Sequence, residues 1–143
     1  MAALYQLEIV TPIGAKFDGE VDNCVLRSTE GDIGILKGHS PYVAAIETGQ
    51  IKIHTAEGQT RYAAASEGFV HVTGELVRIL VSSCEWAEEI DPDQAKAEKE
   101  AARAKVAEAK TPEERELAKY VLQKARIRRR VAKKRADYVA NKK

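Results

Sequence analysis

The chain has 143 residues, a formal net charge of +1 and a hydrophobic fraction of 44%, which favours one or two small globular domains with a modest core. No apolar run reaches the ~18 residues that a membrane span needs, and the N-terminal residues lack the basic and apolar regions of a signal peptide. A membrane-spanning or secreted protein is therefore disfavoured, and we expect a cytoplasmic one.

The small net charge conceals a strong asymmetry along the chain. Residues 1–110 carry 11 Lys and Arg against 18 Asp and Glu, a charge of −7, whereas residues 111–143 carry 12 against 4, a charge of +8. The two ends of the chain therefore differ in the partners that their charges would attract.

Short strand-like segments fill the first part of the chain. Turn residues separate them at intervals of about 8 to 12 residues, which is typical of a β-sandwich or barrel. The expected strands cover residues 5–10, 15–21, 23–28, 32–36, 42–46, 50–55, 59–64, 68–72 and 76–82.

The composition then changes, since all nine glycines lie at or before Gly74 and the rest is rich in Ala, Lys, Arg and Glu. Asp91 followed by a proline predicts the start of one helix, and Thr111, also followed by a proline, predicts the start of a second. We expect helices at 92–109 and 112–140, packed as antiparallel neighbours because their connection is short. The predicted organisation is a β-sandwich at 1–86 and a two-helix tail at 90–143, with Trp86 packing the junction against the sandwich.

Two apolar stripes run along the second predicted helix. One faces the first helix and is rich in alanine: Ala118, Leu122, Ala125, Ala132 and Ala136. It would form a seam with the matching residues of the first helix, which are Ala95, Ala102, Val106 and Ala109. Burying an alanine contributes about 0.8 kcal/mol against about 1.5–3 for a leucine, so we expect a weakly held hairpin that can open. The other stripe, formed by Tyr120, Ile127, Val131 and Tyr138, must meet the β-domain, a partner protein or water.

Side-chain chemistry gives no indication of catalysis. No histidine is arranged with a nucleophile, and His39 reads as a turn or interface residue, whereas His54 and His71 alternate with apolar residues and should face outward. Cys24 and Cys84 lie far apart without ligands at metal-binding spacing, so we expect buried, reduced thiols and no metal.

A glycine-rich segment occupies the centre of the predicted β-domain. It reads Gly31-x-Ile33-Gly34-Ile35-x-x-x-His39-x-Pro41 and is followed by Gly49 at the start of a strand. Together with residues 7–12, residues 67–72 and the Ile90-Asp91 pair, this segment resembles the epsilon subunit of F-type ATP synthases across essentially the whole chain.

The resemblance implies a fold, a function and a set of partners. The fold is an all-β sandwich followed by an α-helical hairpin, and the function is that of a non-catalytic rotor subunit whose tail regulates ATP hydrolysis. The sandwich would contact the gamma shaft subunit and the membrane ring of c subunits, and the protein would be peripheral on the cytoplasmic side of the cell membrane. Matching positions imply that Glu30, Asp32, His39 and Pro41 make these contacts, although turn residues of these types are also common for local reasons.

The basic run of the second helix comprises Arg126, Arg128, Arg129, Arg130, Lys133 and Lys134. Composition alone leaves three partners open: nucleic acid, an acidic membrane surface or an acidic protein surface. The resemblance favours the alpha and beta subunits of the catalytic head. The alternative function is that of a nucleic-acid-associated protein using this helix as a basic arm, although the acidic remainder of the chain argues against it.

The start of the first predicted helix partly matches a nucleotide-binding pattern. No phosphate-binding loop is present, but some members of the family bind ATP through a pattern Ile/Leu-Asp-x-x-Arg-Ala. Here Ile90, Asp91 and Ala95 match this pattern, while Gln94 replaces the arginine and removes its fixed charge. We expect weak ATP binding or none, and no other cofactor.

Overall fold

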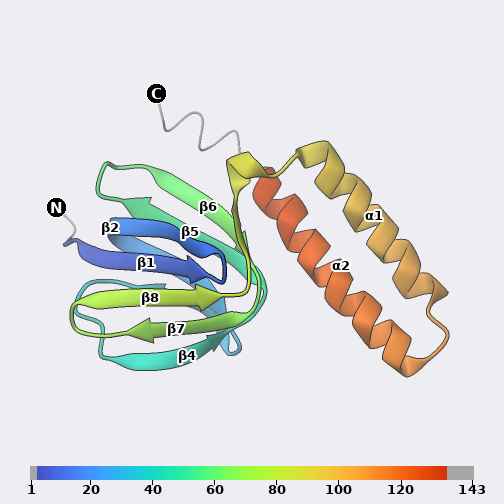
Figure 1. The fold of residues 1–143 in the computed structure, drawn as a ribbon, viewed down its shortest axis with the longest axis horizontal. Helices are drawn as coiled ribbons and strands as arrows, with labels where there is room; N and C mark the ends of the chain where they lie inside the picture. The colour runs from blue at the N-terminus through green and yellow to red at the C-terminus, as the bar shows by residue number, and fades with distance from the viewer. Residues whose placement is uncertain (1–2, 135–143) are drawn as a thin grey trace.

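The computed structural model describes residues 3–134, which form a strand-rich body followed by two helices. In chain order the elements are β1 (Tyr5–Thr11), β2 (Gly14–Ser28), β3 (Gly31–Ile35), β4 (Tyr42–Ile46), β5 (Gly49–Thr55), β6 (Thr60–Ala65), β7 (Gly68–Val72), β8 (Leu76–Val81), β9 (Cys84–Trp86), the 3-10 helix η1 (Ala87–Glu89), α1 (Pro92–Glu108) and α2 (Pro112–Ala132). Figure 1 shows α2 beside the strands and α1 on the far side of α2. The predicted sandwich followed by a helical hairpin is confirmed.

The long strand β2 connects the layers of the sandwich. It pairs with β1 along its first half and with β3 and β5 along its second half. The sequence predicted two separate strands here, at 15–21 and 23–28, which is wrong. A β-bulge between Val21 and Asn23 shifts the register without interrupting the strand. Because a bulge bends a strand, a single strand serves both layers.

The core of the sandwich follows from side-chain alternation. In β1 the inward positions Tyr5, Leu7 and Ile9 are buried, and β8 pairs with this strand in parallel to add Val77 and Ile79 beside them. All nine strands contribute to this single cluster of buried side chains. Period-two alternation with one face buried fixes the register of such strands, because a slip by one residue would expose the whole set.

The strand β9 was not predicted from the sequence. It pairs with β6, so that Ala65 lies opposite Cys84 and Ala63 lies opposite Trp86. Three residues are too few to show an alternating pattern. The Trp86 side chain is buried and meets Phe17 edge-on, with 6.1 Å between ring centroids, which confirms that it packs the junction against the sandwich.

The cysteines and two histidines lie as expected. Cys24 and Cys84 are free and buried, and burial raises the pKa of each thiol to about 12. His71 is exposed, while His54 is half-buried and its Nδ1 lies 2.9 Å from the Asp22 carboxylate.

Side chains cap the start of each α-helix, as predicted. Asp91 Oδ1 accepts from the N–H of Asp93 at 2.9 Å, and Thr111 Oγ1 accepts from the N–H of Glu114 at 3.1 Å. The predicted capping box is shifted, because the Glu114 carboxylate accepts from the N–H of Lys110, one residue before the cap. These bonds satisfy N–H groups that the first turn leaves without partners.

The second helix is shorter than predicted. It ends at Ala132 and passes into a turn at Lys133 and Lys134, whereas the sequence predicted an end near Ala140. The predicted seam residue Ala136 and the stripe residue Tyr138 lie outside the described residues. No helix within residues 3–134 combines the length and apolarity that a membrane span requires.

The two apolar stripes of α2 have different partners. The seam packs against α1 through a small cluster of Ala102, Leu122 and Ala125, with Val106 at its edge. The other stripe meets the β-domain, one of the three predicted possibilities, since Ile127 and Val131 pack with residues of β6, η1 and the start of α1. Two predicted seam residues, Ala95 and Ala132, belong to this second cluster instead. They lie at the ends of the helices nearest the junction, where both helices reach the sandwich.

Candidate interaction surfaces

The residues implied as ring and shaft contacts are all exposed, but they lie at the two ends of β3. Glu30 occupies the turn before β3, and Asp32 forms an ion pair with Arg27 at 3.3 Å. His39 and Pro41 follow β3, in the loop that leads to β4. A strand rises about 3.3 Å per residue, so β3 separates the two pairs by roughly 15 Å. The structure thus presents two small surfaces instead of one.

The loop that carries His39 is held by local geometry. Gly38 adopts a φ of 87°, a conformation open mainly to glycine. The His39 ring lies 4.8 Å from the Tyr42 ring between centroids, and its Nδ1 lies 3.1 Å from the Ser40 carbonyl oxygen. Beneath the loop, the buried Tyr5 hydroxyl donates to the carbonyl of Ile35 at 2.6 Å, and desolvation raises the pKa of that phenol. The loop therefore has a defined shape at its base.

A row of apolar side chains on the outer face of the sandwich was missed in the sequence. Register places Ala45 of β4 opposite Phe69 of β7, Phe69 opposite Leu80 of β8, and Leu80 opposite Val10 of β1. We call these four residues the outer apolar row. Phe69 is 57% exposed and Leu80 is 42% exposed, and Val43 on the same face of β4 is 63% exposed. Figure 1 shows these four strands side by side in one layer.

A sequence signal for this row existed. The segments YVAAI, GFVHV and LVRILV are apolar at several outward positions as well as at the inward ones. Such strands are typical of a sheet covered on both faces. The alignment of the outward residues into one row, however, depends on the pairing of strands that lie far apart in the chain.

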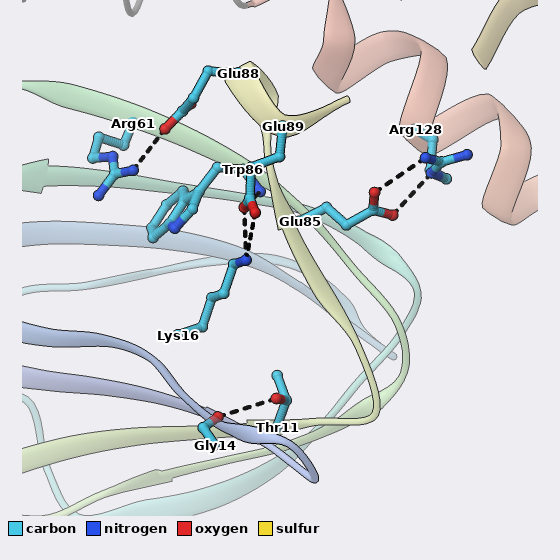
Figure 2. Close-up of polar contacts among 9 residues, drawn as sticks. All are labelled: Thr11, Gly14, Lys16, Arg61, Glu85, Trp86, Glu88, Glu89 and Arg128. Atoms are coloured by element: carbon cyan, nitrogen blue, oxygen red, sulfur yellow. Dashed lines mark hydrogen bonds and ion pairs between the residues drawn. The ribbon is translucent and has the colours of Figure 1, made fainter. Parts of the chain in front are cut away.

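The junction between sandwich and hairpin is held by three ion pairs, drawn in Figure 2. The acidic residues of β9 and η1 each pair with a cation from a different element: Glu85 with Arg128 of α2, Glu88 with Arg61 of β6, and Glu89 with Lys16 of β2. We call this set the junction cluster. The Arg61 guanidinium also lies 3.7 Å from the centroid of the Trp86 ring.

The electrostatics of the junction cluster favour the ionised form of Glu89. Burial works to raise the pKa of Glu89, but hydrogen bonds from Lys16 Nζ and from the backbone N–H of Trp86 outweigh it and lower the pKa. A carboxylate with a depressed pKa stabilises the folded state only where it is ionised. The junction is thus tied to the sandwich from several directions at neutral pH.

The six basic residues implied as contacts of the tail divide into two groups. Arg128 is engaged inside the molecule, and Lys134 Nζ lies 5.2 Å from the centroid of the Tyr62 ring of β6. The other four make no ion pair with any residue that the structure describes; they are Arg126, Arg129, Arg130 and Lys133.

Lys99 and Arg103 of α1 extend this basic surface. Desolvation lowers the pKa of the Lys99 amine, and the positive charges of Arg103, Lys133, Arg126 and Arg129 add to the effect. Lys99 thus lies near one cation of its own helix and three of α2 or its C-terminal end. An acidic partner would relieve the repulsion among these cations.

The three residues that match the nucleotide pattern have structural roles here. Ile90 and Ala95 are buried in the cluster between hairpin and sandwich, and Asp91 caps α1. Gln94 is exposed on the first turn of α1. Within residues 3–134 no three His, Cys, Asp or Glu side chains are grouped as they would be to hold a metal ion.

The described surfaces define the class of protein. A rigid sandwich presents an apolar row and two exposed loops, and a separate hairpin presents a cationic face. These are features of a binding subunit of a larger assembly.

Comparison with known proteins gives the family. The family model of the ATP synthase delta/epsilon chain β-sandwich domain matches residues 4–87. The chain is 44% identical to the ATP synthase epsilon chain of Alkaliphilus oremlandii over 106 residues, covering 74% of this chain and 78% of that one. It is 37% identical to the epsilon chain of Caldanaerobacter subterraneus subsp. tengcongensis over 135 residues, covering 94% and 97%.

Solved structures agree with the fold. A chain of the Euglena gracilis mitochondrial ATP synthase (OSCP/F1/c-ring) superposes with a TM-score of 0.76 and 25% identity, covering 85% of this chain and 76% of that one. A chain of the Tetrahymena thermophila mitochondrial ATP synthase central stalk and c-ring gives a TM-score of 0.62 at 16% identity, covering 88% and 94%, and supports the fold alone.

The chain therefore belongs to the epsilon-chain family of ATP synthases, and the resemblance seen in its sequence is confirmed. It is a non-catalytic subunit of that complex. The comparisons give no support to the alternative of a nucleic-acid-associated protein.

Proposed function

We propose that the chain couples the ion-driven membrane ring to the gamma shaft subunit through its sandwich, and that its hairpin regulates ATP hydrolysis at the alpha and beta subunits of the catalytic head. The outer apolar row carries the first part of this proposal. Phe69 and Leu80 are exposed on the outer face of the sandwich, where a rigid partner would remove them from water. The shaft subunit is the proposed partner of this face.

The two exposed loops around β3 are proposed to complete the contacts. Because about the length of β3 separates Glu30 and Asp32 from His39 and Pro41, the two pairs are expected to meet different parts of the rotor. Asp32 belongs to β3 itself, and the other three residues lie on the short connections at its two ends, so the pairs would transmit force without local unfolding. The subunit would sit on the cytoplasmic side of the membrane as a peripheral component.

Replacement of Phe69 by Asp tests the shaft contact. Aromatic residues at the centre of an interface commonly contribute 2 kcal/mol or more, so we expect affinity for the shaft subunit to fall by about 30-fold or more. Ile13→Asp is the matched control, because Ile13 is 99% exposed on the turn between β1 and β2, outside the outer apolar row. Equal copurification of both variants with the shaft subunit would contradict the proposed surface.

The tail contact is supported by the division of its basic residues. Arg126, Arg129 and Arg130 lie outside the contacts that hold the hairpin on the sandwich, so they are available to acidic surfaces of the catalytic head. Attraction between exposed charges is screened beyond ~8 Å at physiological salt, and inhibition should therefore weaken as salt rises.

Reversal of these three arginines to Glu tests the regulatory role. We expect ATP hydrolysis by the assembled complex to rise while the subunit stays bound through its sandwich. A chain ended after Glu88 should behave in the same way. If both variants leave hydrolysis unchanged at low salt, the tail does not regulate.

Nucleotide binding is proposed to be weak or absent. Ile90, Asp91 and Ala95 already serve packing and capping, and Gln94 offers no positive charge to a phosphate group.

A further inference from the structure

The contact between α2 and the sandwich depends on few residues. Ile127 and Val131 supply the larger buried aliphatic side chains that α2 contributes to it. Tyr120 adds one hydrogen bond, since its hydroxyl donates to Glu67 at 2.7 Å. The contact between α2 and α1 runs along the helices but buries mainly small side chains, with Leu122 as the largest of them. Because few large side chains are buried in either contact, each contact alone is weak for the length of the helices.

Arg128 takes part in both contacts at once. Its Nε and Nη2 donate to the two carboxylate oxygens of Glu85 in β9, at 2.9 and 3.0 Å, and its Nη1 donates to Glu98 in α1. Figure 2 shows the two parallel bonds to Glu85. The side chain of Arg128 is only 26% exposed, and the bonds to Glu85 raise its pKa further. Fork-shaped pairing of this kind fixes geometry more strongly than a single surface ion pair.

We propose that Arg128 is a latch that makes docking of the hairpin on the sandwich and closure of the hairpin depend on each other. Glu98 holds the guanidinium in the position that Glu85 requires, and Glu85 does the same for Glu98. Undocking frees the arginine from Glu85 and removes support from α1, whereas opening of the hairpin removes support from the sandwich contact. The tail would then be released as one event.

Charge balance strengthens the latch. Two carboxylates lie within hydrogen-bond reach of one guanidinium, so loss of the cation would leave them to repel each other across the closed contacts. Arg128→Gln should therefore be more damaging than Glu98→Gln. When Arg128→Gln and Glu98→Gln are combined, only one of the two carboxylates remains and the repulsion is absent. The double variant should therefore recover part of the stability of the closed tail that Arg128→Gln loses.

The meaning of the latch for ATP hydrolysis rests on the proposed regulatory function, but the latch itself is a property of the isolated chain. Amide hydrogen exchange of the full-length chain, measured segment by segment, distinguishes docking of the hairpin from its closure. Exchange in β9 and α2 reports docking, and exchange in α1 reports closure. We expect Arg128→Gln to raise exchange in all three segments by about threefold to tenfold. Glu98→Gln should raise exchange in β9 as well as in α1, although Glu98 does not touch the sandwich.

Two variants serve as matched controls. Arg130→Gln removes a neighbouring cation of α2, and Glu100→Gln removes a neighbouring acid of α1; neither residue makes an ion pair in the described part of the chain. Unchanged exchange in both controls, together with unchanged exchange in β1 and β8 of every variant, shows that effects come from the latch and not from misfolding.

The outcomes are distinct. If Glu98→Gln loosens α1 alone, or if Arg130→Gln acts like Arg128→Gln, Arg128 is not a latch. A failed hydrolysis test with the triple reversal of Arg126, Arg129 and Arg130 would overturn the regulatory function and leave these exchange results standing. The two proposals can therefore fail separately.

Discussion

The sandwich and the hairpin are each held together by buried side chains, but these side chains differ in size. All nine strands of the sandwich contribute to one core, in which Leu7, Ile9 and Ile79 are completely shielded from water. The contact between α1 and α2 buries mainly alanines. Burying the single side-chain carbon of an alanine contributes about 0.8 kcal/mol, against about 1.5–3 kcal/mol for a larger aliphatic side chain. A rigid part and a releasable part are thus combined in one chain, and the difference lies in side-chain size.

Separating the two parts gives the largest expected effect. A chain ending at Glu88 keeps Trp86 and its contacts with Phe17 and Arg61, so we expect a folded sandwich with a cooperative thermal transition. A peptide covering 90–143 loses the sandwich and should be mostly unfolded, because short helices without a core are marginal. Circular dichroism of both pieces checks this, and a stably helical tail peptide would show that the hairpin does not depend on docking.

The same truncation at two positions sharpens the comparison. Ile79 is 0% exposed in the sandwich and Ile127 is 4% exposed between α2 and the sandwich. Ile79→Ala should lower the free energy of global unfolding by about 2–5 kcal/mol. Ile127→Ala should leave that value nearly unchanged and raise hydrogen exchange in α2 instead. Denaturant unfolding combined with exchange separates these outcomes, and equal losses of global stability would mean that the two parts unfold as one unit.

A ligand that binds the closed hairpin would reduce the difference in stability between the hairpin and the sandwich. Ligand at 100 times its Kd stabilises the state it binds by about 2.7 kcal/mol. We expect no such protection by ATP in the natural chain, whereas Gln94→Arg should tighten binding because Gln94 is exposed and the new guanidinium could reach a phosphate. Gln94→Lys is the control, because it supplies a positive charge without the planar, two-pronged donor group of arginine. Calorimetry checks the series, and micromolar binding by the natural chain would refute the expectation.

The smallest expected effect concerns a single bond between the two parts. The hydrogen bond that Tyr120 donates is the largest cause of the lowered pKa of Glu67. A carboxyl whose pKa is lower in the folded state stabilises that state above its unfolded pKa, and this contribution is lost as the pH falls through the folded value. Tyr120→Phe should therefore move the pKa of Glu67 upward, as carbon NMR of the carboxyl group would show. An unchanged pKa would indicate that α2 is not docked here in solution.

Local chemistry made much of this fold predictable. Turn residues at regular spacing identified most strands, and Asp91 and Thr111, each followed by a proline, marked the helix starts that the structure contains. These signals act within a few residues, so they survive in a sequence read without its partners. The glycine-rich segment identified the family for the same reason.

The surfaces depended on pairing between distant segments. Side-chain periodicity showed that α2 has two apolar stripes, but only the docked helix shows which of them the sandwich covers. The docked helix also shows that Arg128 pairs with the sandwich, whereas Arg126, Arg129 and Arg130 do not. The outer apolar row likewise requires the register of β1, β8, β7 and β4, and the continuity of β2 requires the bulge at its pairing with β5. Sequence by itself thus determined where most strands and both α-helices start and which residues are apolar, because those properties are local. Tertiary structure alone decided which side chains share a partner, because strand register and helix docking are set by the combined burial of residues far apart in the chain.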